Sequence, residues 1–236
     1  MANQYFNFKH FAINQDQCAM KVGTDGVLLG AWCEVENIET ILDVGTGTGL
    51  IALMLAQRSG SQIDAIEIDD AAFNQAAENF KNSPWHNSMY IHFGSFENYL
   101  SEKRYDLIVS NPPYFSNSFK PSNNSRKIAR HTEHLNFDTL IKQSAALLSN
   151  NGKLSVIIPF ESEGYFMESA AKENLFLKYK CDVKPTPIKN PSRVMLFFEL
   201  NYKGKTREET LVISESERHQ YTQDYKTLTK DFYLNF

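Results

Sequence analysis

The chain of 236 residues has little cysteine, little glycine or proline, and no long apolar run. Its three cysteines, Cys18, Cys33 and Cys181, are too scattered for a disulfide framework, and no CxxC pair is present. Eleven glycines and eight prolines exclude collagen-like and low-complexity chains. No apolar stretch approaches the ~20 residues that span a bilayer, and the first ten residues lack the apolar core of a signal peptide. We therefore expect a soluble protein of the reducing cytoplasm.

Charge of one sign is not in large excess either. The chain has 24 basic and 28 acidic residues, a net charge of −4, which does not by itself indicate a nucleic-acid partner. The distribution matters more, because a phosphate backbone is met by a local patch. Segment 120–131 contains four basic residues and no acid, and further basic clusters lie within 176–193 and 203–207. This segregation leaves a nucleic-acid partner open.

Short apolar runs alternate with helical patterns, which is typical of βαβ units and a largely parallel sheet. The patterns predict strands at 41–44, 63–68, 89–93, 105–109, 154–158 and 194–200, and helices at 50–57, 70–82 and 137–148. We expect an extended or hairpin segment within 6–13 and a short helix from Gly23-Thr-Asp25 to Trp32. One domain is predicted, with an N-terminal cap (1–37), a core (38–200) and a docked, aromatic-rich tail (201–236).

The first motif is a glycine-rich loop between a predicted strand and helix, Asp43-Val-Gly45-Thr-Gly47-Thr-Gly49. Glycine lets the backbone turn sharply and brings its N–H groups close to a nucleoside ligand. Glu67 closes the next strand, 22 positions after Gly45, where a carboxylate can accept both hydroxyls of an adenosine ribose. The alternative is a tight strand–helix turn without a ligand, and the combination of strand, helix and trailing acid disfavours it.

The second motif, Asn111-Pro112-Pro113-Tyr114, directly follows the predicted strand 105–109 and Ser110. Two consecutive prolines remove two backbone donors, so the segment presents carbonyl oxygens. Asn111 adds an amide oxygen and Tyr114 an aromatic face, which together suit a planar group that carries an NH₂. A rigid proline turn is the alternative. The motif is similar to that of methyltransferases that act on amino groups.

Several segments together resemble the bacterial tRNA1(Val) (adenine-N6)-methyltransferase family. They are MKVGTDGVLLGAW (20–32), DVGTGTGLIALMLAQR (43–58), NPPYF (111–115), RKIARH (126–131), VKP (183–185) and YKTLTKDFYL (225–234). The resemblance implies an α/β, Rossmann-like class I methyltransferase with helices on both faces of a seven-stranded, mostly parallel sheet. The implied strand order is 3-2-1-4-5-7-6, with the last strand antiparallel. It also implies S-adenosylmethionine (AdoMet) as cofactor and the adenine beside the anticodon, position 37, as the methylated base.

The motifs and the resemblance together assign candidate site residues. The cofactor-binding candidates are Thr24, Asp25, Asp43, Gly45, Gly47, Gly49, Glu67, Ser95 and Asn111. The catalytic candidates, which hold the target amine, are Asn111, Pro112, Pro113 and Tyr114. The candidates for RNA phosphates are Lys120, Arg126, Lys127 and Arg130. Thr24 and Asp25 have helix capping as an alternative role, and the basic group has a solvated surface as its alternative.

The sequence also bears on metal binding, membrane association and alternative functions. His131 and His134 stand three apart without further ligands at metal-site spacing, so we expect no metal. We also expect no membrane partner and a monomer. A protein glutamine N5-methyltransferase shares the NPPY motif, as do methyltransferases of rRNA or DNA, but the glutamine enzymes normally carry a separate N-terminal helical domain. An NAD-linked dehydrogenase leaves NPPY unexplained, and a non-enzymatic RNA-binding module predicts no cofactor dependence.

Overall fold

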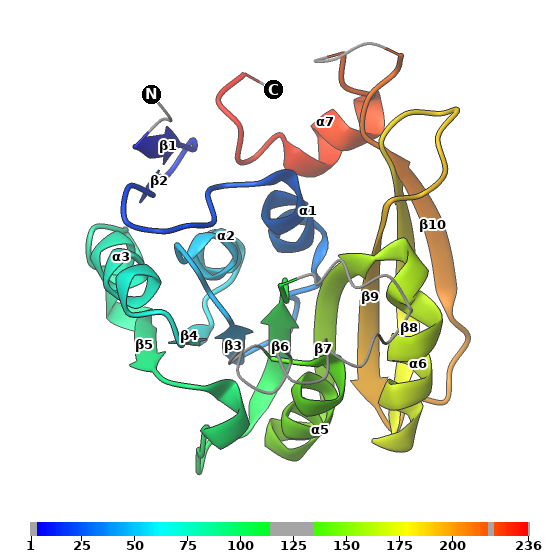
Figure 1. Ribbon diagram of the computed structural model, residues 1–236, viewed down its shortest axis with the longest axis horizontal. Helices are drawn as coiled ribbons and strands as arrows, with labels where there is room; N and C mark the ends of the chain where they lie inside the picture. Colours follow the sequence, from blue (N-terminus) through cyan, green and yellow to red (C-terminus); the bar gives the residue numbers. More distant parts are fainter. Residues whose placement is uncertain (1–3, 114–134, 217–219, 236) are drawn as a thin grey trace, which may run out of the picture.

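The computed structural model of the chain describes residues 4–113, 135–216 and 220–235. Its centre is an eight-stranded sheet with the order β10-β8-β9-β7-β6-β3-β4-β5 (Figure 1). The strands are β3 (Thr40–Val44), β4 (Gln62–Glu67), β5 (Met89–Phe93), β6 (Tyr105–Ser110), β7 (Leu148–Pro159), β8 (Leu175–Lys184), β9 (Arg193–Leu200) and β10 (Arg207–Val212). Strands β3 to β7 are parallel, and β9 is antiparallel to β7 and β8. The implied order 3-2-1-4-5-7-6 is therefore confirmed from β5 to β8.

The expected count of seven strands is wrong by one, because the tail adds β10 beside β8 in parallel. Among the residues of β10, Leu211 alone is buried, so the segment has almost no apolar signal. The sequence patterns do not predict strand β8 either. Its apolar residues are interrupted by three lysines, so the segment resembles a basic cluster more than a strand.

Helices cover both faces of the sheet, as expected (Figure 1). One face is packed by α1 (Thr24–Trp32), α2 (Leu50–Arg58), α3 (Asp70–Lys81) and α7 (Gln223–Thr229), the other by α5 (Phe137–Leu147) and α6 (Glu163–Lys172). Helix α3 begins where the Asp69 side chain accepts a hydrogen bond from Ala72 N (2.8 Å). Helix α5 ends directly at β7, which begins six residues before the predicted strand at 154.

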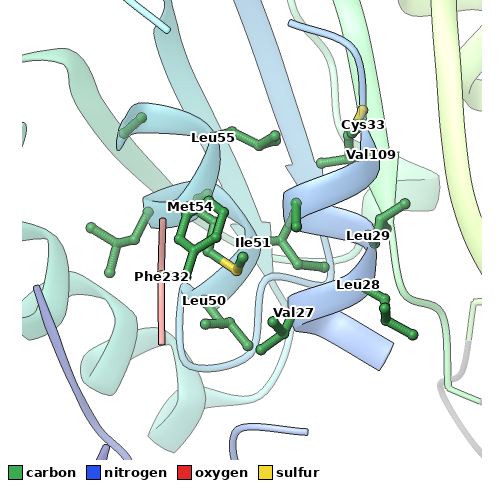
Figure 2. Close-up of a cluster of buried hydrophobic side chains, with 14 of the residues drawn as sticks. Val27, Leu28, Leu29, Cys33, Leu50, Ile51, Met54, Leu55, Val109 and Phe232 are labelled. Carbon is green, nitrogen blue, oxygen red and sulfur yellow. The ribbon is translucent and has the colours of Figure 1, made fainter. Parts of the chain in front are cut away.

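The two ends of the chain lie near each other on the α1–α2 side of the sheet (Figure 1). The N-terminal hairpin of β1 (Tyr5–Asn7) and β2 (Ala12–Asn14) matches the predicted segment. Lys9 N donates to Phe232 O (2.9 Å), and Gln57 Nε2 donates to Asp231 O (2.9 Å). Figure 2 shows Phe232 of the tail in one buried cluster with side chains of α1 and α2. In the described residues no helix is long and apolar enough to cross a membrane.

Candidate active site

A cavity of about 430 Å³ lies at the carboxyl ends of β3 and β6. Its lining comes from the segment that leads into α1 (within 20–26), the loop and first turn of α2 (within 45–51), residues 111–113, and Arg193. Strand β3 has β4 on one side and β6 on the other, so this is the point where the strand order reverses. Open α/β sheets bind ligands at such a point.

The glycine-rich loop supplies an open cradle on one wall of the cavity. Gly45 and Gly47 have φ values of +69° and +58°, and a Cβ added to either would meet no atom within 4 Å. Gly45 N and Thr46 N both donate to Ile66 O (2.9 and 3.2 Å), which ties the loop to β4. The left-handed backbone favours glycine at both positions, and the space beside them is open to a ligand.

Glycine is required at position 49 for a different structural reason. It caps α2 with φ +84°, and its added Cβ would lie 2.5 Å from Cε1 of Phe80 in α3. It does not line the cavity. The third glycine therefore allows α2 to pack closely against α3.

Asp43 lies beneath the loop, fully buried, and does not line the cavity. Its Oδ2 accepts hydrogen bonds from Thr46 Oγ1 (2.7 Å) and Ala52 N (3.1 Å). Oδ1 is buried and has no hydrogen-bond partner among the described residues. Burial raises the pKa of Asp43 to about 7, although the two hydrogen bonds oppose that shift. Asp43 thus holds the loop to the start of α2.

Glu67 ends β4 beside the cradle, nearly buried. Its Oε2 accepts from Gly47 N (2.8 Å), and its Oε1 accepts from Ile68 N and Asp69 N (2.9 and 3.0 Å). A carboxylate offers about four acceptor positions, and three are used here. Accepting both hydroxyls of a ribose would require Oε2 to give up its bond to Gly47.

The opposite wall contains Asn111, Pro112 and Pro113 directly after β6. Ser110 Oγ donates to Val44 O (2.9 Å), which joins the ends of β6 and β3. Tyr114, the fourth residue of the motif, lies outside the described residues, as do the predicted RNA contacts Lys120, Arg126, Lys127 and Arg130.

Thr24 and Asp25 line the cavity at the start of α1. The N-cap is Gly23, so the alternative in which these side chains cap the helix is wrong. Asp25 Oδ2 instead accepts from Arg193 Nε (2.8 Å). Arg193 was missed as a site residue because it lies 168 positions away in sequence, and no local pattern links the two.

Ser95 follows β5 and Gly94 and precedes a short 3-10 helix, Phe96–Asn98. Its side chain makes no capping hydrogen bond, and it does not line the cavity. A contact of Ser95 with the cofactor therefore stays a prediction.

The basic cluster on β8 is largely paired with carboxylates. Lys178 Nζ lies 2.8 Å from Glu199 Oε2, and Lys180 Nζ lies 2.6 Å from Glu163 Oε1 and 3.3 Å from Asp182 Oδ1. These lysines therefore offer little uncompensated charge to a phosphate backbone. Within the part of the chain that the structure describes, no group of three or more His, Cys, Asp or Glu residues could hold a metal ion.

Comparisons with known proteins agree on one kind of enzyme. The family model "Methyltransferase small domain" matches residues 22–168. The tRNA1(Val) (adenine(37)-N6)-methyltransferases of Trichodesmium erythraeum and Parabacteroides distasonis are 48% and 45% identical to the chain, covering 100% and 99% of it and the same shares of their own lengths. Among solved structures, a predicted O-methyltransferase from Agrobacterium tumefaciens has a TM-score of 0.71 and 15% identity, covering 88% of this chain and 96% of its own. That structural likeness bears on the fold alone.

Proposed function

Because this chain belongs to the tRNA1(Val) (adenine(37)-N6)-methyltransferase family, we infer that it transfers a methyl group from AdoMet to N6 of adenine 37 in tRNA1(Val). One observation carries the assignment of the site. A single cavity joins the open glycine cradle of β3 to the Asn-Pro-Pro segment of β6. Donor and acceptor of the methyl group can therefore be bound face to face.

The cradle fits the cofactor. The cavity of about 430 Å³ is open above Gly45 and Gly47, since a Cβ there would meet nothing within 4 Å. Glu67 does not line that cavity, but it ends the neighbouring strand and its Oε2 accepts from Gly47 N, so we assign it to the ribose hydroxyls. Thr24 and Asp25 line the far part of the cavity, where the methionine end is expected. AdoMet supplies an electrophilic methyl group on a sulfonium.

The Asn-Pro-Pro segment prepares the target amine. An adenine amino nitrogen is a poor nucleophile because its lone pair is delocalised into the ring. The Asn111 side-chain oxygen and the Pro112 carbonyl accept its two hydrogens, which concentrates electron density on nitrogen and favours its pyramidal form. Tyr114 is expected to stack on the everted base. Positioning accounts for much of the rate, and the proton leaves to water after transfer.

The remaining assignments concern the RNA and the state of the enzyme. The four basic residues Lys120, Arg126, Lys127 and Arg130 lie 6 to 16 positions after Tyr114, so they are assigned to tRNA phosphates around the everted base. The enzyme is assigned to the cytoplasm, since its substrate is a cytoplasmic RNA, and a monomer stays an expectation. A glutamine-modifying role is not favoured, because relatives named for the tRNA reaction match the chain over its full length.

The direct test is nucleoside mass spectrometry of tRNA1(Val) after incubation with the protein and isotopically labelled AdoMet. We expect labelled N6-methyladenosine at position 37, formed at least about 100-fold more slowly by an Asn111→Ala control. Label in a release-factor peptide and none in tRNA would overturn the proposal.

A further inference from the structure

Asn79 of α3 is a buried amide, 2% exposed, that contacts two segments from other parts of the chain. Its Oδ1 accepts from Asn14 N (2.9 Å), and its Nδ2 donates to Asn14 O (2.9 Å) and to Thr48 O (2.8 Å). All three partners are backbone groups of residues outside α3. The amide therefore bonds the end of β2 and the glycine-rich loop to the same point of α3.

The three partners match the donors and acceptors of an amide. One partner is an N–H and two are carbonyl oxygens, while an asparagine side chain offers one acceptor oxygen and two N–H donors. A carboxylate in this position would face both carbonyl oxygens without a hydrogen, and an apolar side chain would remove all three hydrogen bonds. The pattern of partners thus requires an amide at this position.

The segment 15–23 joins β2, which lies beside α3, to the start of α1 (Figure 1). Near its two ends, Gln15 Oε1 accepts from Val22 N (2.8 Å). Near its middle, Gln17 N donates to Gln75 Oε1 of α3 (2.9 Å). This connecting segment is therefore bonded end to end, and it is anchored on the helix that carries Asn79.

The connecting segment and the glycine-rich loop are two walls of one cavity, since residues within 20–23 and within 45–48 both line it. Asn79 does not line the cavity, so it acts on a bound ligand only through these walls. The next residue of α3, Phe80, packs against Gly49 at the end of the loop. Helix α3 thus supports the loop at two successive positions and the connecting segment at the same end.

We propose that Asn79 is a positioning residue that fixes the spacing between the connecting segment and the glycine-rich loop, and so sets the affinity of the cavity for AdoMet. The proposal rests on the proposed function, since it takes AdoMet as the ligand between these walls. Asn79 has no part in the chemistry, because its side chain lies behind the lining. Loss of the amide weakens binding equally in the ground state and the transition state, which raises KM for AdoMet at constant kcat.

The test compares Asn79→Leu with wild type by calorimetric AdoMet titration and by steady-state methylation of tRNA, at a temperature where both are folded. Kd and KM for AdoMet should rise roughly tenfold, the effect of about one net hydrogen bond. The value of kcat at saturating AdoMet should stay within about threefold, because the chemistry does not use the amide.

Asn79→Asp adds a readout that depends on pH. Near neutral pH its carboxylate faces the carbonyl oxygens of Asn14 and Thr48, so AdoMet affinity should fall as in Asn79→Leu. At lower pH the protonated carboxyl can donate to one of these oxygens, and part of the affinity relative to wild type should return. Asn79→Leu should show no such recovery.

Cys18 reports directly on the connecting segment. Its side chain is buried, and that burial raises the pKa of the thiol, so iodoacetamide should alkylate it slowly in the wild-type protein. Alkylation of Cys18 should be faster in Asn79→Leu, while Cys33 and Cys181, which are buried elsewhere, should keep their wild-type rates. Peptide mass spectrometry gives the three rates separately.

Tyr105→Phe is the matched control. It removes a buried hydrogen bond from Tyr105 Oη to Asp64 Oδ2 (2.8 Å) at the start of β6, the opposite end of that strand from the Asn-Pro-Pro segment. This variant should lower Tm and leave the Kd and KM for AdoMet and the alkylation rate of Cys18 unchanged. A general loss of stability is thereby separated from a displaced cavity wall.

Higher Kd and KM at constant kcat, together with faster alkylation of Cys18, support the positioning role of Asn79. Unchanged Kd and KM in folded Asn79→Leu, or an equal rise in Tyr105→Phe, would overturn it, although methylation by the wild-type protein would still stand. Should Asn79→Leu not fold, the AdoMet affinity of Asn79→Asp at two pH values decides in the same way. Wild-type protein that does not bind AdoMet would overturn the proposed function, and this inference with it.

Discussion

Replacing Gly47 by valine tests two requirements for glycine in the loop: the left-handed backbone of the folded protein, and the close approach of AdoMet to that backbone. Gly47 has φ +58°, and a Cβ built there meets no atom within 4 Å. The Cβ of a valine therefore has open space around it. We take the left-handed backbone as the main cost to the fold, while the isopropyl group extends into the space above the loop.

The two effects have different sizes. A side-chain-bearing residue in the left-handed region costs about 1–2 kcal/mol in the free energy of unfolding. For a protein of this length about 1 kcal/mol corresponds to roughly 2–4 °C in Tm, so the variant should melt roughly 2–8 °C lower and stay folded at room temperature. AdoMet must approach the backbone where the isopropyl group lies. Its affinity should therefore fall by at least about 100-fold, or about 2.8 kcal/mol.

Two other glycines serve as comparisons in the same assays, thermal unfolding and calorimetric AdoMet titration. Gly49→Ala places a Cβ 2.5 Å from Phe80 Cε1 at φ +84°, so it should lose more stability, roughly 2–4 kcal/mol, and keep near-normal AdoMet affinity while folded. Gly60→Ala meets nothing within 4 Å and has no left-handed φ, so it should change neither quantity. Unchanged AdoMet affinity in folded Gly47→Val would refute this reasoning, as would wild-type protein that binds NAD as tightly as AdoMet.

Three further predictions test other parts of the site. Asn111→Ala should lower kcat about 100-fold or more with nearly unchanged AdoMet affinity, because its acceptor acts chiefly in the transition state; near-normal turnover would contradict the mechanism. Charge reversal of Arg126 and Arg130 to Glu should weaken tRNA binding and flatten its salt dependence at constant AdoMet affinity, and equal tRNA affinity would move the RNA surface elsewhere. Burial raises the pKa of Asp43 from its ordinary 3.8 to about 7, so the folded protein retains a proton that the unfolded chain releases. The free energy of unfolding should therefore decline between about pH 4 and 7; urea titrations of Asp43→Asn should lack that part of the slope, and an unchanged slope would argue against a protonated Asp43.

The central part of the fold was predictable because its strands are buried on both faces. Strands β3 and β6 are mostly buried and contain short apolar runs, and α3 shows a clear helical period, so local sequence was sufficient there. The edge of the sheet was harder. Lysines alternate with apolar residues along β8, and they are stabilised by carboxylates of α6 and β9 that no local window contains. Strand β10 exists because β8 offers it an edge, not because of its own composition.

The candidate site likewise has parts that a local segment predicts and parts that depend on residues distant in sequence. Two parts of the cavity lining come from contiguous segments, residues 45–48 and 111–113, and each segment could be found from its motif. The motif did not distinguish the roles of its glycines, however, since Gly49 is needed for close packing against Phe80 in α3. Arg193 could not be found from local sequence, because its place in the site depends on the ion pair with Asp25, 168 positions earlier. Sequence reasoning thus identified two segments that line the cavity and missed the ion pair at its edge.

The geometry of the sheet also explains why this chemistry needs no nucleophilic side chain. Val44 and Ser110 are register partners on adjacent parallel strands, joined further by the bond from Ser110 Oγ to Val44 O. Neighbouring strands are about 4.8 Å apart, so the glycine-rich loop after β3 and the Asn-Pro-Pro segment after β6 begin one strand spacing from each other. All three cysteines are buried with raised pKa values, about 12 for Cys33 and Cys181, so none supplies a thiolate. Methyl transfer in line requires the reacting atoms to be brought to about 3–3.5 Å, a task of positioning that two loops starting on adjacent strands favour.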